Sequence, residues 1–253
     1  MNNIFVHKGY YTYLYKGPSN KLPVVSEILY GEYFKILSKN KNWIKVKTSF
    51  DNYIGYIKDK LYVEKSLSTH KIYTLKARIF TKPSVKKKYK TEKFLSFASR
   101  ISIIQSHKGF IEYEKNKWIK QINIRNVSHI EKDYVKILKL FLKAKYVWGG
   151  KTFRGIDCSA LLQLIFFYNN RFYPRDTIDQ IKYLGSNIKK KIFKKGDIIF
   201  WNGHVAICIN NKELIHAFGP KKKVVLMNIK KTIIEIKKNS ELSIISVKNI
   251  NAY

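Results

Sequence analysis

Cys158 stands where a loop leads into an apolar run. It follows YVWGGKTFRGID (146–157), and the residues after it, from Ala160 to Phe167, are mostly apolar. This order predicts a buried helix with the cysteine in its first turn. A thiol there meets exposed backbone N–H groups and the positive end of the helix dipole, and both favour the thiolate. Cys158 is therefore a candidate nucleophile.

A cysteine nucleophile needs a base, and histidines lie on two consecutive predicted strands. His204 begins HVAICI, and His216 follows twelve residues later in ELIHAFG. A hairpin at Asn210–Lys212 would set these strands side by side, where paired side chains come within hydrogen-bond reach. His204 could then take the thiol proton while His216 orients it. On spacing alone, a structural or surface role is the commoner one for a histidine in a strand.

Short strands are predicted ahead of this region. From Tyr10 to about Ile124, runs rich in Tyr, Ile, Val and Phe are separated by turn residues, and the side chains of NWIKVKT (42–48) alternate between two faces. Residues 71–124 loosely repeat the plan of the first segment: RIFTKPSVKKK is similar to YLYKGPSNKLP, and NKWIKQINI to NWIKVKT. The repeat predicts two tandem β-barrels of ~55–60 residues each.

After Asn126 the pattern becomes helical. Apolar residues from Ile130 to Phe141 recur at helical spacing, with Ser128 as the expected N-cap, and PRDTIDQIKYLG (174–185) predicts a short helix with proline at its start. From Lys195 onward the chain returns to strands, GDIIFW, HVAICIN, KELIHAFG, KVVLMNI and LSIISVKN. A helical half with the cysteine and an antiparallel sheet with the histidines is an α+β layout.

The net charge of +33 raises the question of a nucleic-acid partner. Only six of the 50 basic residues are arginine, although recognition of phosphates and bases favours the arginine fork. The lysine runs are short, at Lys86–Lys88, Lys189–Lys191 and Lys221–Lys223. We therefore interpret the charge as a solvated lysine surface and expect no nucleic-acid partner.

Other functional classes leave no pattern in the sequence. No apolar run reaches the roughly 18 residues of a membrane span, and the N-terminus has no signal-peptide pattern. We expect a cytoplasmic location, with an extracytoplasmic one left open, and free thiols, Cys208 being a small buried hydrophobic residue. Metal-site spacing and phosphate-binding loops are missing, so no metal or cofactor is expected. The remaining histidines are expected at the surface: His7, His70, His107 and His129.

Five motifs carry a family resemblance. YVWGG…GIDCSALLQ, PRDTIDQ, KKGDIIFW, GHVAI and LIHAFG resemble, in order and spacing, the NlpC/P60 family of cell-wall cysteine peptidases, over about Glu131 to Val247. ILYGEYF, NWIKV and DNYIGYI resemble the bacterial SH3 domains that precede this catalytic domain. The resemblance implies an α+β fold, with a papain-like NlpC/P60 domain (128–253) preceded by two small SH3-like β-barrels (1–65 and 66–127).

The same resemblance implies roles for particular residues. Cys158 would be the nucleophile, His204 the base and His216 the third polar residue, and Tyr146 would help to form the oxyanion hole. The chain is most similar to the subgroup of two-SH3 γ-D-glutamyl-L-diamino-acid endopeptidases, which trim released peptidoglycan peptides. That likeness implies substrate contacts for Asp157, Ser159, Tyr53, Glu32 and Trp148. Ala160 departs from the family, which usually has glycine there.

In that subgroup the aspartate before the nucleophile binds the free amine of an N-terminal L-Ala. Asp157 matches it, with Tyr53 and Glu32 completing the pocket, Ser159 on the peptide backbone and Trp148 at the cleft edge. A carboxylate pairs well with an ammonium group. Because a buried carboxylate without its cation is costly, we expect substrates that lack the amine to lose on the order of 10²-fold or more in kcat/KM.

These observations favour a cysteine endopeptidase that hydrolyses the γ-D-glutamyl–diamino acid bond of free peptidoglycan peptides. Two alternatives stay open. One is a non-catalytic cell-wall-binding protein. The other is an amidase or acyltransferase of the same fold, since fold does not fix the substrate.

Overall fold

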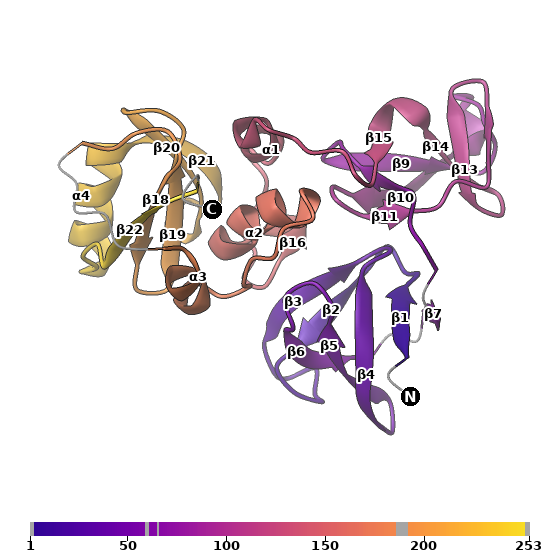
Figure 1. Cartoon of the computed structure of the whole chain (residues 1–253), viewed down its shortest axis with the longest axis horizontal. Helices are drawn as coiled ribbons and strands as arrows, with labels where there is room; N and C mark the ends of the chain where they lie inside the picture. The colour runs from indigo at the N-terminus through magenta and orange to yellow at the C-terminus, as the bar shows by residue number, and fades with distance from the viewer. Residues whose placement is uncertain (1–2, 59–60, 65, 186–191, 251–253) are drawn as a thin grey trace. The chain divides into compact units, whose positions relative to one another are not determined.

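A computed structural model describes residues 3–58, 61–64, 66–185 and 192–250. The chain forms two compact units (Figure 1). Unit 1 holds residues 1–131, together with the short segments 151–153 and 167–170. Unit 2 holds residues 132–150, 154–166 and 171–253.

The N-terminal half of unit 1 is an antiparallel sheet in the order β3–β2–β6–β5–β4–β1–β7. In β5 (Trp43–Thr48), Ile44, Val46 and Thr48 are buried and the residues between them are half-buried, which is the predicted alternation. The sheet closes over Leu14, Phe34 and their apolar neighbours. The other strands are β1 (Ile4–His7), β2 (Tyr11–Tyr15), β3 (Val24–Leu29), β4 (Tyr33–Asn40), β6 (Ile54–Ile57) and β7 (Tyr62–Glu64).

The second half of unit 1 has the sheets β10–β9–β14–β13–β12 and β11–β8–β15 around a core that includes Leu95 and Ile119. Trp118, which repeats Trp43 in sequence, lies in β14 (Lys117–Lys120), so both tryptophan motifs are strands. The remaining elements are β8 (His70–Ile72), β9 (Lys76–Phe80), η1 (Lys87–Tyr89), β10 (Lys90–Ser96), β11 (Arg100–Ile101), β12 (Gln105–His107), β13 (Phe110–Glu114), η2 (Gln121–Asn123) and β15 (Ile124–Asn126).

Unit 2 is built from the sheet β21–β20–β19–β18–β22 and helix α2 (Cys158–Tyr168). Every residue of α2 is buried, as expected of a helix that is apolar on all sides. The strands are β17 (Gly155–Ile156), β18 (Asp197–Trp201), β19 (His204–Cys208), β20 (Glu213–Phe218), β21 (Lys223–Asn228) and β22 (Ser246–Asn249). The other helices are α1 (Tyr134–Leu140), α3 (Thr177–Tyr183), η3 (Gly219–Lys221) and α4 (Ile229–Ser240), and β16 (Lys151–Thr152) belongs to unit 1.

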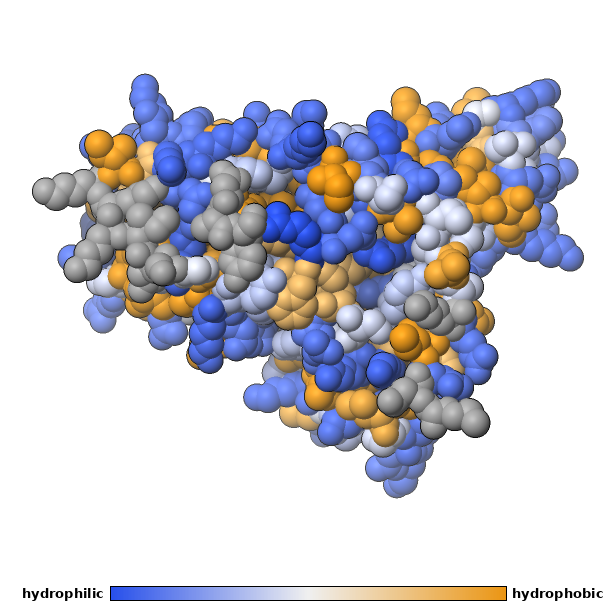
Figure 2. Space-filling view, in the orientation of Figure 1, coloured by the Kyte–Doolittle hydropathy of each residue, from blue (hydrophilic) through white to orange (hydrophobic). Residues whose placement is uncertain are grey.

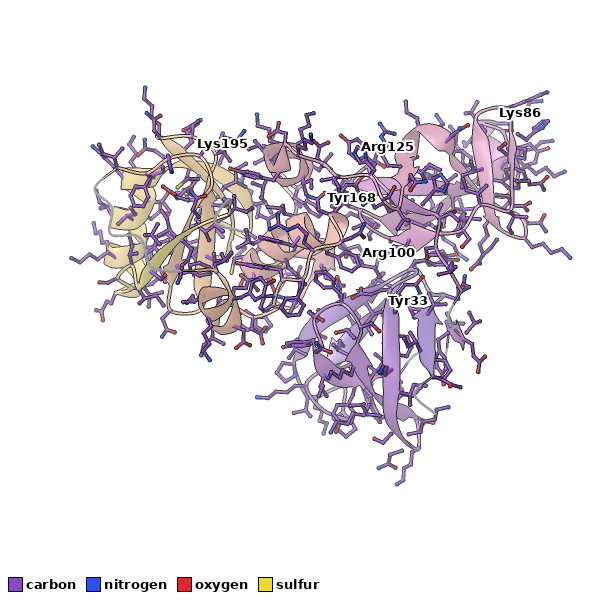
Figure 3. All side chains as sticks on the ribbon, viewed as in Figure 1. Tyr33, Lys86, Arg100, Arg125, Tyr168 and Lys195 are labelled. Carbon is purple, nitrogen blue, oxygen red and sulfur yellow. The ribbon has the colours of Figure 1, made fainter. Side chains whose placement is uncertain are left out.

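The last residues of α2 belong to unit 1, where Lys71 of β8 holds them. The buried ammonium of Lys71 donates hydrogen bonds to the carbonyl oxygens of His129 (2.7 Å) and Tyr168, and lies 4.1 Å from the Tyr168 ring. Phe97 stacks on the same ring at 4.9 Å between centroids (Tyr168 is labelled in Figure 3). A cation at a helix C-terminus satisfies carbonyls that the helix leaves unpaired. Helix α2 therefore begins in unit 2 and ends in unit 1.

Two predicted helices begin later than expected. Helix α1 begins after Asp133, while both the backbone N–H and the hydroxyl of Ser128 donate to the side chain of Asn126. The predicted Ser128 cap is wrong because this local turn satisfies the serine instead. Helix α3 begins at Thr177, so Pro174 lies ahead of the helix rather than in its first turn.

Helix α4 occupies a region where the sequence analysis expected only strands. The Asn228 side chain caps it by accepting a hydrogen bond from the backbone N–H of Lys231 (3.1 Å). Ile229, Thr232 and Ile236 are buried at helical spacing. Since β-branched residues are typical of strands, these isoleucines hid the helical period.

The burial predicted from the sequence is correct for Cys208 but not for every histidine. Cys208 is fully buried in the apolar cluster of the unit 2 sheet, which confirms the prediction. His7 is also fully buried, because β1 lies between β4 and β7, so a surface position is wrong for it. His107 is exposed, and His70 and His129 are half-buried.

Hydrophilic residues cover most of the face seen in Figure 2, in keeping with the high lysine content. Lys86–Lys88 and Lys221–Lys223 are exposed, whereas the predicted run Lys189–Lys191 lies outside the described residues. Within the described ranges, no helix combines the length and the apolar character that a membrane crossing requires.

Candidate active site

Cys158 is the first residue of α2, and Asp157 caps this helix. The Oδ1 atom of Asp157 accepts hydrogen bonds from the backbone N–H of Ala160 (2.8 Å) and from the Ser159 hydroxyl (3.1 Å). This is N-cap geometry, which holds the thiol in the first turn as the sequence predicts. Ala160 is fully buried, so its methyl group is accommodated where the family usually has glycine.

Arg175 pairs with both carboxylate oxygens of Asp157. Its Nη2 lies 2.6 Å from Oδ2 and its Nη1 lies 3.1 Å from Oδ1 and 2.8 Å from the Ser159 hydroxyl. Both side chains are buried, at 1% and 8% exposure, so the bidentate pair is shielded from water. The backbone N–H of Gly149, a residue with φ of 74°, adds a hydrogen bond to Oδ2 (2.9 Å). The charge of Asp157 is therefore compensated before any substrate arrives.

The sequence analysis assigned no role to Arg175. The residue was visible in the PRDTIDQ motif that carried the family resemblance, where Pro174 and Asp176 flank it. Nothing in its spacing from Asp157 indicates the ion pair, because α2 and the loop after it intervene.

Strands β19 and β20 form the predicted hairpin. Ile207 pairs with Ile215 and Cys208 with Leu214, around a turn at residues 209–212. This register brings His204 Nε2 to 2.9 Å from His216 Nδ1. The two histidines therefore lie on adjacent strands within hydrogen-bond distance, as predicted, although the register sets them diagonally rather than directly opposite each other.

Met227 of β21 determines which nitrogen of each histidine carries the proton. Its sulfur lies 3.3 Å from His216 Nε2, and a thioether can only accept a hydrogen bond. In a neutral His216, Nε2 then carries the proton and Nδ1 accepts. His204 Nε2 must donate to that Nδ1, which leaves the lone pair of His204 on its own Nδ1. The strand spacing gave no signal for Met227, which pairs across the sheet with Leu214 rather than with a histidine.

The thiol lies against this hairpin. The backbone of Val205, next to His204, forms a hydrogen bond with the Cys158 sulfur. Cys158 and His216 also line one internal cavity of about 10 Å³, roughly the space of one water molecule. Cys158 and the histidine pair therefore belong to a single group of side chains within unit 2.

Burial keeps this group neutral at rest. It raises the pKa of the Cys158 thiol to about 12, with a further rise from Asp157, and hydrogen bonds from Val205 and Ser159 only partly oppose it. Burial also lowers the pKa of His204 to about 4. The pKa of His216 falls well below its ordinary value through burial, His204 and Lys221. The expected thiolate at the helix N-terminus is thus outweighed by desolvation.

Tyr146 lies beside the same hairpin. Its ring atoms come within 3.6 Å of the point where a side chain on Gly219 would begin, so the glycine makes room for it. Burial, Cys158 and Asp157 raise the pKa of the phenol, which therefore stays a hydrogen-bond donor. Trp148 is 65% exposed, as a residue at a cleft edge would be.

The remaining predicted substrate contacts, Glu32 and Tyr53, belong to unit 1. Glu32 is buried, and Lys151 Nζ lies 2.9 Å from each of its carboxylate oxygens. The backbone N–H of Lys151 donates to Glu27 as well (2.6 Å). Tyr53 is half-buried, and its backbone N–H donates to the Thr48 hydroxyl (2.9 Å). Lys151 is a second partner that the sequence analysis missed.

A thiol beside a hydrogen-bonded histidine pair can perform acyl transfer. The arrangement has a nucleophile, a base and a group that orients the base, which is what covalent catalysis by cysteine requires. In the described part of the chain, no three His, Cys, Asp or Glu side chains form a group suited to a metal ion.

Comparison with known families agrees with this geometry. Residues 143–240 match the NlpC/P60 family, and residues 14–60 match the bacterial dipeptidyl-peptidase Sh3 domain. The chain carries an NlpC/P60 domain behind a bacterial SH3 domain. The predicted cysteine peptidase class and the predicted α+β fold class are both confirmed.

Relatives span most of the chain. The γ-D-glutamyl-L-lysine dipeptidyl-peptidase of Bacillus subtilis is 24% identical over 84% of this chain and 78% of its own length. Dipeptidyl-peptidase 6 of Lysinibacillus sphaericus is 25% identical over 81% and 83%. Among solved structures, an NlpC/P60 family protein from Bacillus cereus matches 97% of this chain and 99% of its own, with a TM-score of 0.78 at 16% identity, which shows a shared fold.

Proposed function

We propose that this peptidase hydrolyses the γ-D-glutamyl–diamino acid bond of free peptidoglycan peptides, L-Ala-γ-D-Glu-diamino acid. The single observation that carries the proposal is the His204–His216 pair, 2.9 Å apart, next to the thiol at the start of α2. The substrate class rests on relatives named γ-D-glutamyl-L-lysine dipeptidyl-peptidases, of which the matches cover 78% and 68% of their own lengths.

Cys158 acts as the nucleophile. Its sulfur attacks the γ-carbonyl carbon of D-Glu while the thiol proton passes to His204 Nδ1, and the Tyr146 hydroxyl donates a hydrogen bond to the developing oxyanion. The intermediate expels the amine of the diamino acid, which takes the proton from His204. Water, activated by the same nitrogen, then hydrolyses the thioester and releases L-Ala-D-Glu and the free thiol.

The resting protonation states suit a proton transfer that accompanies attack. A His204 whose pKa is about 4 is unprotonated at neutral pH and can accept the thiol proton. His216, held by Met227, keeps the lone pair of His204 on Nδ1. His216 is therefore a positioning residue in this proposal.

Recognition of the free amine involves carboxylates that already have partners. Arg175 compensates Asp157, and Lys151 compensates Glu32. A substrate ammonium group would share one of these carboxylates with its arginine or lysine partner. Acetylation of the substrate amine therefore leaves the carboxylate paired. We therefore expect acetylation of the amine to cost about tenfold in kcat/KM, less than an unpaired carboxylate would impose.

The test is to incubate the full chain with L-Ala-γ-D-Glu-L-Lys, its diaminopimelate analogue and their N-acetylated forms, and to weigh the products by mass spectrometry. The proposal expects L-Ala-D-Glu and the free diamino acid, with the acetylated peptides slower. Tyr53→Phe and Ser159→Ala report the predicted substrate contacts. Release of alanine alone would favour an amidase of the same fold, and intact peptides would favour a wall-binding protein.

A further inference from the structure

The second half of unit 1 carries a concave basic groove of about 420 Å³. Lys76 and Arg78 of β9, Lys90 of β10 and Lys120 of β14 line it. Phe80 and Phe94 supply its apolar lining. The loop from β9 to β10, marked by Lys86 in Figure 3, belongs to the same part of the unit. We call these cations and the space between them the basic groove.

Most of the positive charge in the basic groove lacks a counterion. Arg78 forms an ion pair with Glu92 (2.8 Å), whose side chain is 89% exposed. In the ranges that the structure describes, no carboxylate lies within ion-pair distance of Lys76, Lys90 or Lys120. The other acidic residues of this half are engaged elsewhere, Glu112 with Gln105 and Glu114 with Tyr30 and Lys117.

This differs from two buried cations of the chain. Lys151 and Arg175 each bind both oxygens of one carboxylate. Like charges that converge on one concavity repel each other, and an anion bound between them removes that repulsion. The uncompensated charge of the basic groove thus points to an anionic ligand.

Arg78 is held in one orientation before any ligand binds. Its Nη1 donates to the carbonyl oxygen of Thr91 (2.5 Å) as well as to Glu92, and its guanidinium lies 4.6 Å from the Phe94 ring. The ammonium of Lys76 lies 4.9 Å from the same ring. An oriented guanidinium in the same groove as three lysine ammonium groups suits a ligand that offers several oxygens at once.

We propose that the basic groove binds a phosphate-bearing chain. A phosphate exposes more charged oxygens than a carboxylate and can therefore contact several of the four cations together. The volume falls within the range of sites for small ligands and is too small for a folded partner, so short stretches of a chain fit it. The proposal goes beyond the peptidase function and uses none of its residues.

The apolar lining indicates that the phosphate-bearing ligand need not carry nucleotide bases. Phe80 is buried, and Phe94 already has Lys76 and Arg78 next to its ring, so base stacking on these rings has little room. Linear polyphosphate, which has phosphates alone, should therefore bind as well as a single-stranded oligonucleotide with the same number of charges.

The test measures binding of fluorescent polyphosphate to the full chain by anisotropy at 150 mM salt. The groove variant Lys90→Glu/Lys120→Glu is compared with Lys230→Glu/Lys231→Glu on α4, which changes the net charge equally at exposed positions. We expect the groove variant to lose at least about tenfold in affinity and the α4 variant about twofold or less. Equal losses in both would overturn the proposal, because general attraction to a basic protein would explain them.

Two further measurements test whether the basic groove prefers phosphate to carboxylate and whether it needs nucleotide bases. Poly-L-glutamate of matched charge should bind at least about tenfold more weakly than polyphosphate, and equal binding would overturn the assignment to phosphate. If an oligonucleotide binds much more tightly than polyphosphate and Phe94→Ala removes that difference, the inference that nucleotide bases are not needed is overturned. Both charge variants should keep wild-type hydrolysis of the tripeptide, which separates this proposal from the peptidase function and shows that the variants are folded.

Discussion

Unit 1 and the catalytic group of unit 2 bury ionisable side chains in different ways. In unit 1, Lys151 and Glu32 are 3% and 2% exposed and form an ion pair at 2.9 Å. In unit 2, burial shifts the pKa of Cys158 and both hairpin histidines toward their neutral forms. The contrast teaches that an opposite charge in contact keeps Lys151 and Glu32 charged in the interior, whereas the thiol and the hairpin histidines become neutral on burial.

Each kind of burial supports a different task. The Asp157–Arg175 pair, directly beside Cys158, uses opposite charges to fix the start of α2. Burial leaves the thiol and His204 neutral, which suits the proposed proton transfer between them. Fixed charge therefore holds the scaffold while neutral groups remain free to react.

The largest effect should come from removing the thiol. Cys158→Ala is expected to abolish hydrolysis while keeping the fold, because alanine is accommodated at a helix start and only the sulfur attacks. Cys208→Ala, the matched control within the β19 core, should stay active with a modest loss of stability. Product formation by mass spectrometry and thermal melting check both variants, and an active Cys158→Ala would refute the assignment of the nucleophile.

Substitution of His204 and of His216 should lower kcat to different extents. His204→Ala removes the base and should lower kcat by about 10²–10⁴-fold, whereas His216→Gln removes only its orienting partner and should leave measurable turnover. Steady-state kinetics on the free tripeptide checks this order. Rates like the wild type in both variants would remove the hairpin from the mechanism.

The sequence predicted the placement of the candidate catalytic residues better than their surroundings. Cys158 was visible because an apolar run follows it, and the histidines because strand alternation and a short turn fix their register. Arg175 and Met227 were not, because one lies in the loop after α2 and the other in β21, and no local pattern shows which side chains they face. Burial also cannot be summed from a local pattern, which is why the resting state of the thiol and the position of His7 differed from expectation.

Removal of one partner of the Lys151–Glu32 ion pair in unit 1 should lower the stability to unfolding. Lys151→Met leaves Glu32 buried without its cation and should destabilise unit 1 by about 3 kcal/mol. The double variant Lys151→Met/Glu32→Gln should recover much of this loss, since no lone charge remains. Urea unfolding of the single and double variants measures it, and a single variant as stable as the wild type would show that the pair contributes nothing.

The acid limb of the pH profile should lie lower than for an ordinary histidine. With the pKa of His204 lowered to about 4, the base is unprotonated above that value and gains its proton only as pH falls through it. Activity should therefore be retained from neutral pH down to about 5 and lost near 4. The profile of kcat/KM for the free tripeptide tests this, and a midpoint at 6.5 would mean that burial does not govern His204.

The smallest effect should come from Met227→Leu, which keeps the volume and removes the acceptor for His216 Nε2–H. We expect a severalfold fall in kcat with little change in KM or melting temperature. Nitrogen NMR of labelled histidine should show a shift in the tautomer of His216. Met227→Gln, which restores an acceptor, should recover part of the rate, and unchanged spectra in Met227→Leu would remove its positioning role.

Helix α2 has a consequence for how this chain could be rearranged during evolution or by engineering. Its first residue is Cys158, the proposed nucleophile, and its last carbonyl accepts a hydrogen bond from Lys71, which comes from a strand nearly a hundred positions earlier in the sequence. A catalytic segment excised at Lys132 would carry the helix without that ammonium group. The SH3-like segments therefore cannot be exchanged freely. A recombined chain must supply a new cation for the C-terminal end of α2.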